Sequence, residues 1–116
     1  MAFTLTTDHF STKEEALAEI AERGWCAIEL DVPADEETLH WHEFDTVIFV
    51  LAGTARAAFE GGSVMECGAG ARIEAPARVV HRATSPAYQA IFGFSIDPAD
   101  MTQPVNKPVE DPPVAR

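Results

Sequence analysis

The chain of 116 residues is poor in several features on which other classes of protein depend. It has 8 lysine and arginine residues against 19 acidic ones, and the net charge of −11 disfavours binding to phosphate backbones. Its two cysteines lack CxxC spacing, so we expect no disulfide and interpret both as small buried hydrophobes. No apolar run approaches the roughly 18 residues of a membrane helix, and the N-terminus shows no signal peptide. We therefore expect a cytoplasmic protein that binds neither nucleic acid nor a membrane.

Short apolar segments separated by turn residues make up most of the chain. Helical spacing is confined to the stretch between Ser11 and Gly24, where Ser11 or Thr12 is the expected N-cap and a glutamate three residues later the capping-box partner. From Trp25 onward the apolar residues recur with a period of two. The expected strands are 25–31, 38–51 (one long strand or two joined by a bend), 54–59, 64–67, 71–75, 79–84 and 87–96. Such spacing, with glycine and proline between the strands, predicts an all-β sandwich or barrel.

The last twenty residues differ from the rest in composition, since five of the eight prolines lie there. Proline cannot donate to a strand ladder, so this segment is expected to stay outside the interior of any sheet. The length fits a single domain. We divide the chain into an N-terminal segment with a short helix (1–24), a barrel (25–96) and an extended proline-rich tail (97–116).

Three of the four histidines lie in two strand-and-turn patterns. His40 and His42 are two residues apart, so on a strand they share one face and stand about 7 Å apart. His81 begins another strand after the turn at Pro76, and if that strand lies opposite the first, its ring can reach the same ion as His40 and His42. Imidazole is a ligand for zinc, copper, iron and nickel, so the pattern predicts a metal site. The alternative is three unrelated histidines on the surface or in the core.

These spacings resemble the two sequence motifs of the cupins. The first motif of that family is Gly, five residues, His-x-His, three or four residues, Glu, six residues, Gly; the second is Gly, five residues, Pro-x-Gly, two residues, His. The positions of this chain that match are His40, His42 and Gly53 in the first motif and Gly70, Pro76 and His81 in the second. The resemblance covers roughly residues 25–96 and implies a small double-stranded β-helix, a jelly-roll-like cupin barrel. It also implies one divalent metal ion (Fe, Zn, Ni, Mn or Cu) held by the three histidines, and a homodimer.

The carboxylate ligand of the first motif has no counterpart at its usual place. It would fall on Thr46 or Val47, and neither is a good ligand. Asp45 and Glu43 lie nearby, but strand parity puts both on the face opposite the histidines unless a bulge rotates the chain. The expected metal ligands are therefore three histidines, with Asp45 as the candidate for a fourth. Similar three-histidine sites occur among cupin-type dioxygenases.

Four further residues are candidates for binding a substrate. Phe44 and Ile48 share the face of the histidine pair, and Tyr88 opens the last strand of the barrel. Arg78 precedes His81 and replaces the glycine of the second motif, where its guanidinium could hold a carboxylate through two hydrogen bonds. The alternatives are core packing for the apolar residues and Tyr88, and a solvated surface position for Arg78.

The sequence leaves three functional hypotheses open. The first is a metal-dependent enzyme, such as a dioxygenase or an isomerase, that acts on a small metabolite, an anionic one if the site lacks a carboxylate. The second is a non-catalytic protein that binds or senses a small ligand, and the third is a metal-free barrel whose histidines bind the ligand directly. The tail and the apolar outward faces at Val47, Phe49 and Leu51 also suggest a homodimer.

Overall fold

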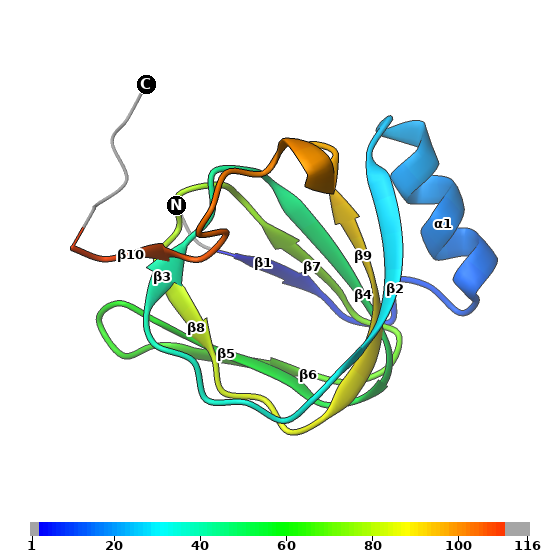
Figure 1. Cartoon of the computed structure of the whole chain (residues 1–116). Helices are drawn as coiled ribbons and strands as arrows, with labels where there is room; N and C mark the ends of the chain where they lie inside the picture. Colours follow the sequence, from blue (N-terminus) through cyan, green and yellow to red (C-terminus); the bar gives the residue numbers. More distant parts are fainter. Residues whose placement is uncertain (1–2, 111–116) are drawn as a thin grey trace.

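Two antiparallel five-stranded sheets lie opposite each other in the computed structural model, which describes residues 3–110, and one helix covers the outside of one sheet (Figure 1). The strand order is β1-β7-β4-β9-β2 in the first sheet and β10-β3-β8-β5-β6 in the second. The all-β jelly-roll-like barrel predicted from the sequence is therefore confirmed. The elements in chain order are β1 (Thr4–Thr6), α1 (Lys13–Glu22), β2 (Cys26–Val32), β3 (His40–Trp41), β4 (Thr46–Gly53), β5 (Ala55–Phe59), β6 (Val64–Cys67), β7 (Arg72–Ala75), β8 (His81–Ala83), β9 (Tyr88–Phe94), the 3-10 turn η1 (Pro98–Asp100) and β10 (Lys107–Pro108).

Helix α1 begins with the capping box expected from its sequence. The side chain of Thr12 accepts a hydrogen bond from the Glu15 N–H at 3.2 Å, and the Glu15 carboxylate accepts one from the Thr12 N–H at 3.0 Å. The helix ends before Gly24, whose φ of +71° suits a residue without a side chain. Local sequence therefore sets both ends of the helix.

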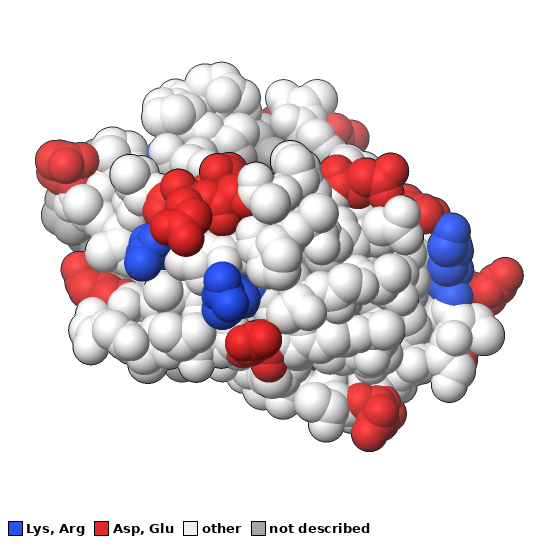
Figure 2. Space-filling view, turned by 90° about the horizontal axis from the view of Figure 1, so that it is seen from below, with Lys and Arg blue, Asp and Glu red and all other residues white. Residues whose placement is uncertain are grey.

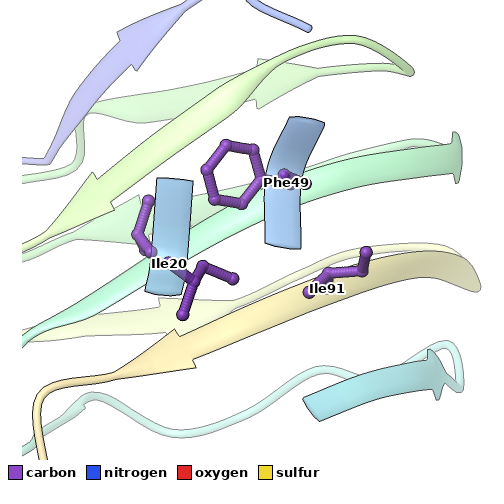
Figure 3. Close-up of a cluster of buried hydrophobic side chains, with 5 residues drawn as sticks. Ile20, Phe49 and Ile91 are labelled. Carbon is purple, nitrogen blue, oxygen red and sulfur yellow. The ribbon is translucent and has the colours of Figure 1, made fainter. Parts of the chain in front are cut away.

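The helix is held by a core on the outer face of the first sheet. Ile20 from α1 packs with Val47 and Phe49 of β4 and with Ile91 of β9, and all four are fully buried (Figure 3). The approach is close, because a Cβ added to Gly93 of β9 would lie 2.9 Å from Ile20 Cγ1 and 2.8 Å from Val47 Cγ1. The apolar face that suggested a homodimer is thus covered by the chain's own helix. The homodimer stays a prediction, but the apolar face at Val47, Phe49 and Leu51 no longer supports it.

Two strands come from outside the segment assigned to the barrel. β1 pairs with β7, and β10 from the proline-rich tail pairs with β3, each at an edge of its sheet. Proline at an edge costs no ladder hydrogen bond, which is why a segment ending in Pro108 can pair there. Neither strand is among those expected from the sequence. The last part of the tail, 111–116, lies outside the described residues.

Charged side chains are dispersed on the face seen in Figure 2. The few lysine and arginine side chains there stand apart among acidic and neutral residues, and form no continuous basic patch on that face. Within residues 3–110, no helix has the length and apolar character needed to cross a membrane.

A carboxylate at the inner side of α1 links the helix to the sheet. Glu19 lies 2.7 Å from the His9 ring, 2.9 Å from the Arg23 guanidinium and 2.7 Å from that of Arg72 on β7. Arg23 also reaches Glu74 on β7, at 2.8 Å. Burial by itself would raise the pKa of Glu19, but the hydrogen bonds from these three partners outweigh it and lower the pKa to about 2.

This network predicts an acid-sensitive contribution to stability. A carboxyl whose pKa falls on folding stabilises the fold above its unfolded value, here 4.5, and loses that contribution as the pH falls toward about 2. We expect Glu19→Gln to lower the free energy of unfolding at pH 7 by on the order of 2–3 kcal/mol. The variant should also show a flatter pH dependence than the parent between these pH values in urea titrations. Glu22→Gln, at an exposed position of the same helix, is the control; parallel profiles for the parent and Glu19→Gln would contradict the assignment.

Candidate metal centre

Three histidine rings meet at the inner side of the second sheet. His40 lies on β3, His42 follows it, and His81 begins β8 directly opposite His40 in the antiparallel register. Their potential ligand atoms all lie within 4.8 Å of one another, and their ring centroids are 4.6–5.2 Å apart. The structure therefore brings together the three histidines singled out by the sequence, close enough to hold a metal ion.

A backbone carbonyl orients each ring. The three Nδ1 atoms contact carbonyl oxygens as follows: His40 to Thr38 at 2.8 Å, His42 to Val105 at 3.0 Å and His81 to Val79 at 2.8 Å. A carbonyl oxygen can only accept, so each Nδ1 carries the hydrogen and each Nε2 is left with its lone pair in the neutral ring. This is the arrangement by which proteins orient metal-binding histidines.

Burial keeps two of these rings neutral. Desolvation lowers the pKa of His42 and lowers that of His81 to about 4, and the neighbouring His40 ring adds to both effects. Neutral imidazole is the form that binds a metal ion, so His42 and His81 need lose no proton for this purpose at neutral pH.

The rings face a cavity of about 430 Å³ between the two sheets. Its wall is mainly apolar, and three of the four residues predicted to bind a substrate, Phe44, Ile48 and Tyr88, belong to it. The ring of Phe44 stacks on that of His42 with centroids 5.1 Å apart. Other large apolar residues of the wall are Phe3, Ile28, Ile73, Phe92 and Phe94. A volume of this size fits a small molecule.

Asp45 and Glu43 lie apart from the three rings. The Asp45 carboxylate accepts the Ala77 N–H at 2.8 Å in the turn after β7, and the Glu43 carboxylate accepts from Thr102 in the tail. Neither belongs to the group of converging ligand atoms found among the described residues. The chain bends at Glu43 and Phe44, between β3 and β4, and the register shift in β4 lies farther along, between Val50 and Ala52. Both carboxylates are therefore engaged by backbone groups elsewhere, and neither supplies a fourth ligand in this arrangement.

Arg78 is exposed and does not line the cavity. Its contribution to the site is made by the backbone, since its N–H donates to the carbonyl of His42 at 2.9 Å. Its φ of +69° is in the left-handed region, which costs a residue with a Cβ about 1–2 kcal/mol. That conformation gives a physical reason for the glycine of the cupin motif at this position.

Sequence reasoning missed a carboxylate that does reach the site. Glu37 Oε1 lies 3.8 Å from Nε2 of His40 and accepts the Ala83 N–H at 2.9 Å. Within residues 3–110, Glu37 is the only acidic residue of the cavity wall. Glu37 lies between two of the strands expected from the sequence, and its one signal is its position three residues before His40. Thr46, where the cupin carboxylate would fall, is buried and lines the cavity.

The fold and the three-histidine group define a cupin-like β-barrel with a candidate metal site, and comparison with solved structures agrees about the fold. A DUF861 family protein from Thermotoga maritima superimposes with a TM-score of 0.55 and 14% identity, over 78% of this chain and 96% of that one. A protein from Neisseria meningitidis superimposes with a TM-score of 0.52 and 22% identity, over 60% of this chain and 73% of that one. No family model matches the sequence, and no curated protein matches it. At these identities the likeness concerns the fold alone.

Proposed function

We propose that the protein binds one divalent metal ion through His40, His42 and His81 and acts on a small, mainly apolar metabolite with an oxygen-bearing head group. The reaction class we favour is that of a dioxygenase or an isomerase. The observation that supports this most is the convergence of three histidine ligand atoms, within 4.8 Å of one another, at the wall of a mainly apolar cavity. When bound, such an ion polarises a substrate oxygen or, as iron, also supplies redox chemistry.

The polar groups of the cavity constrain the ligand. Arg56 is the only arginine or lysine in the described part of the cavity wall, and its guanidinium already donates to the carbonyl of Thr84 at 2.7 Å. An anionic head group would therefore be attracted mainly by the metal ion, whose charge three neutral rings leave intact and Glu37 partly offsets.

Tyr88 supplies a hydrogen-bond donor on the same wall. Burial raises its pKa to about 12, and the negative charge of Glu37 adds to this effect. The hydroxyl therefore stays protonated at neutral pH and can donate to an oxygen of the ligand. The apolar residues around it would exclude water from the body of the ligand.

A non-catalytic protein that binds a small ligand is the second candidate. The observation that favours it is the scarcity of charged groups in the cavity, where the described wall has one acidic residue and one arginine. In that case the ion would anchor the ligand without turnover. A fold of this kind supports both functions, so the choice depends on the site and not on the fold.

Metal content and oxygen uptake together test the proposal. Protein purified without a metal-affinity tag is expected to contain about one ion per chain, as a three-histidine site predicts. The iron-loaded protein, prepared without air, is then offered phenolic acids, thiols and diketones in an oxygen electrode, and hydroxyketones with apolar side chains in an isomerisation assay. Turnover that disappears with a chelator would support the enzyme, and ligand binding without turnover would support the second candidate. Metal far below stoichiometry after metal loading, with ligand binding insensitive to chelator, would overturn the proposal.

A further inference from the structure

The segment 98–108, which we call the C-terminal strap, forms part of the cavity wall. After β9 the strap crosses to the second sheet, where β10 pairs with β3 (Figure 1). Four strap residues line the cavity: Pro98, Met101, Val105 and Asn106. From the sequence this segment is expected only to be an extended tail, and no role in the site follows from it.

The strap is anchored mainly through Thr102. The Glu43 carboxylate accepts from the Thr102 N–H at 2.8 Å and from its hydroxyl at 2.8 Å. The ammonium of Lys107 donates to the Thr102 carbonyl at 3.0 Å and to its hydroxyl oxygen at 2.6 Å. Lys107 then pairs with Trp41 in the register of β10 and β3.

One of these strap residues also orients a ring of the metal centre. The acceptors for His40 and His81 lie two residues before each histidine, so they move with the strand that carries the ring. The acceptor for His42 is the carbonyl of Val105, 63 residues away in the strap. His42 and Glu43 are neighbours, so the same short loop contacts the strap at both Val105 and Thr102.

We propose that the C-terminal strap is a positioning element of the metal centre, which holds His42 in its ligand orientation and closes the cavity at the same time. When Thr102 is released from Glu43, the His42 ring loses its fixed acceptor and the wall formed by the strap opens. Metal retention and access to the cavity are then coupled. The role of the strap in holding His42 for a metal ion rests on the proposed function. Its role in closing the cavity does not.

The test weakens the anchor without touching a ring. Glu43→Ala is expected to weaken Zn²⁺ binding by about tenfold and to speed metal transfer to a chelator by a similar factor, as loss of an orienting contact does elsewhere. It should also increase the binding of an apolar fluorescent dye. Thr102→Val changes no charge and should move both readouts in the same direction, which separates release of the strap from loss of a negative charge near His42. Glu66→Ala, at an exposed position on β6, is the control and should match the parent.

The outcomes distinguish this inference from the proposed function. If the parent binds Zn²⁺ and both variants retain it as well as the parent, the inference is wrong and the metal site stands. If the parent binds no Zn²⁺, the proposed function fails, and unchanged dye binding in both variants would then overturn the strap as well. Thermal melting of each variant confirms that the barrel is folded.

Discussion

Replacing His42 by alanine is expected to lower metal affinity by more than about 100-fold while the barrel still folds, because a site with two protein ligands holds a divalent ion far less tightly than a site with three. His42 lies after β3 and outside the ladder that joins β3 to β8, so its removal leaves the strand pairing unchanged. The side chain is half-buried and belongs to neither core cluster of the described residues. Co²⁺ titration followed by absorbance measures the loss, and circular dichroism verifies the fold.

The fourth histidine of the chain supplies the matched control. His9 precedes α1 and contacts Glu19, on the far side of the first sheet from the three rings. We expect His9→Ala to lower stability slightly and to leave metal stoichiometry unchanged. Full stoichiometry in His42→Ala, or an equal loss of metal in both variants, would remove the three-histidine site from consideration.

Patterns within a few residues predicted the elements that position the site. The stretch 38–51 forms two strands joined by a bend, β3 and β4, and its alternation correctly separated two faces: Phe44 and Ile48 line the cavity, whereas Val47 and Phe49 pack under α1. The same parity placed the carboxylate of Asp45 away from the rings. A period of two is a property of the extended backbone itself, so it can be read without knowing any partner strand.

The site residues that sequence reasoning missed depend on long-range pairing. Glu37 reaches His40 because its carboxylate is held by the N–H of Ala83, 46 residues away, and the carbonyl of Val105 reaches His42 across 63 residues. Neither contact leaves a periodic pattern in the sequence. β1 and β10 are short edge strands whose pairing is likewise decided by the fold and not by their composition.

The glycines of the motifs can be explained in the same physical terms. Gly53 and Gly70 have φ of +82° and +88°, and Arg78 occupies a third left-handed position with a φ of +69°. The sequence spacing that resembles the cupins therefore marks places where the backbone must turn in a way that side chains oppose. At Arg78 a residue with a side chain takes up the left-handed conformation, and its side chain is exposed. At Gly53 a side chain is excluded by the backbone atoms of Ala87 and Tyr88 as well.

Gly53→Ala is accordingly expected to lower the free energy of unfolding by about 3–4 kcal/mol, the sum of a left-handed residue with a Cβ and of overpacking. An added Cβ would lie 2.7 Å from the Ala87 carbonyl oxygen and 2.9 Å from Tyr88 Cα, both of them backbone atoms that cannot rotate away. Gly53 pairs with Tyr88 in the register of β4 and β9, so relief of the clash must displace a residue of the cavity wall. Urea denaturation measures the loss of stability, and dye or ligand binding reports the displacement.

A second glycine separates the two causes. Gly62, in the turn between β5 and β6, has a φ of +94°, but a Cβ added there would meet no atom within 4 Å. Gly62→Ala therefore carries the conformational cost alone, about 1–2 kcal/mol, and should leave the cavity unchanged. Equal losses in the two variants would mean that the backbone conformation alone, without the contact with Tyr88, accounts for the glycine at position 53. A larger loss at Gly53, accompanied by altered binding in the cavity, would instead show that this glycine lets β4 and β9 approach closely enough to place Tyr88 in the wall of the site.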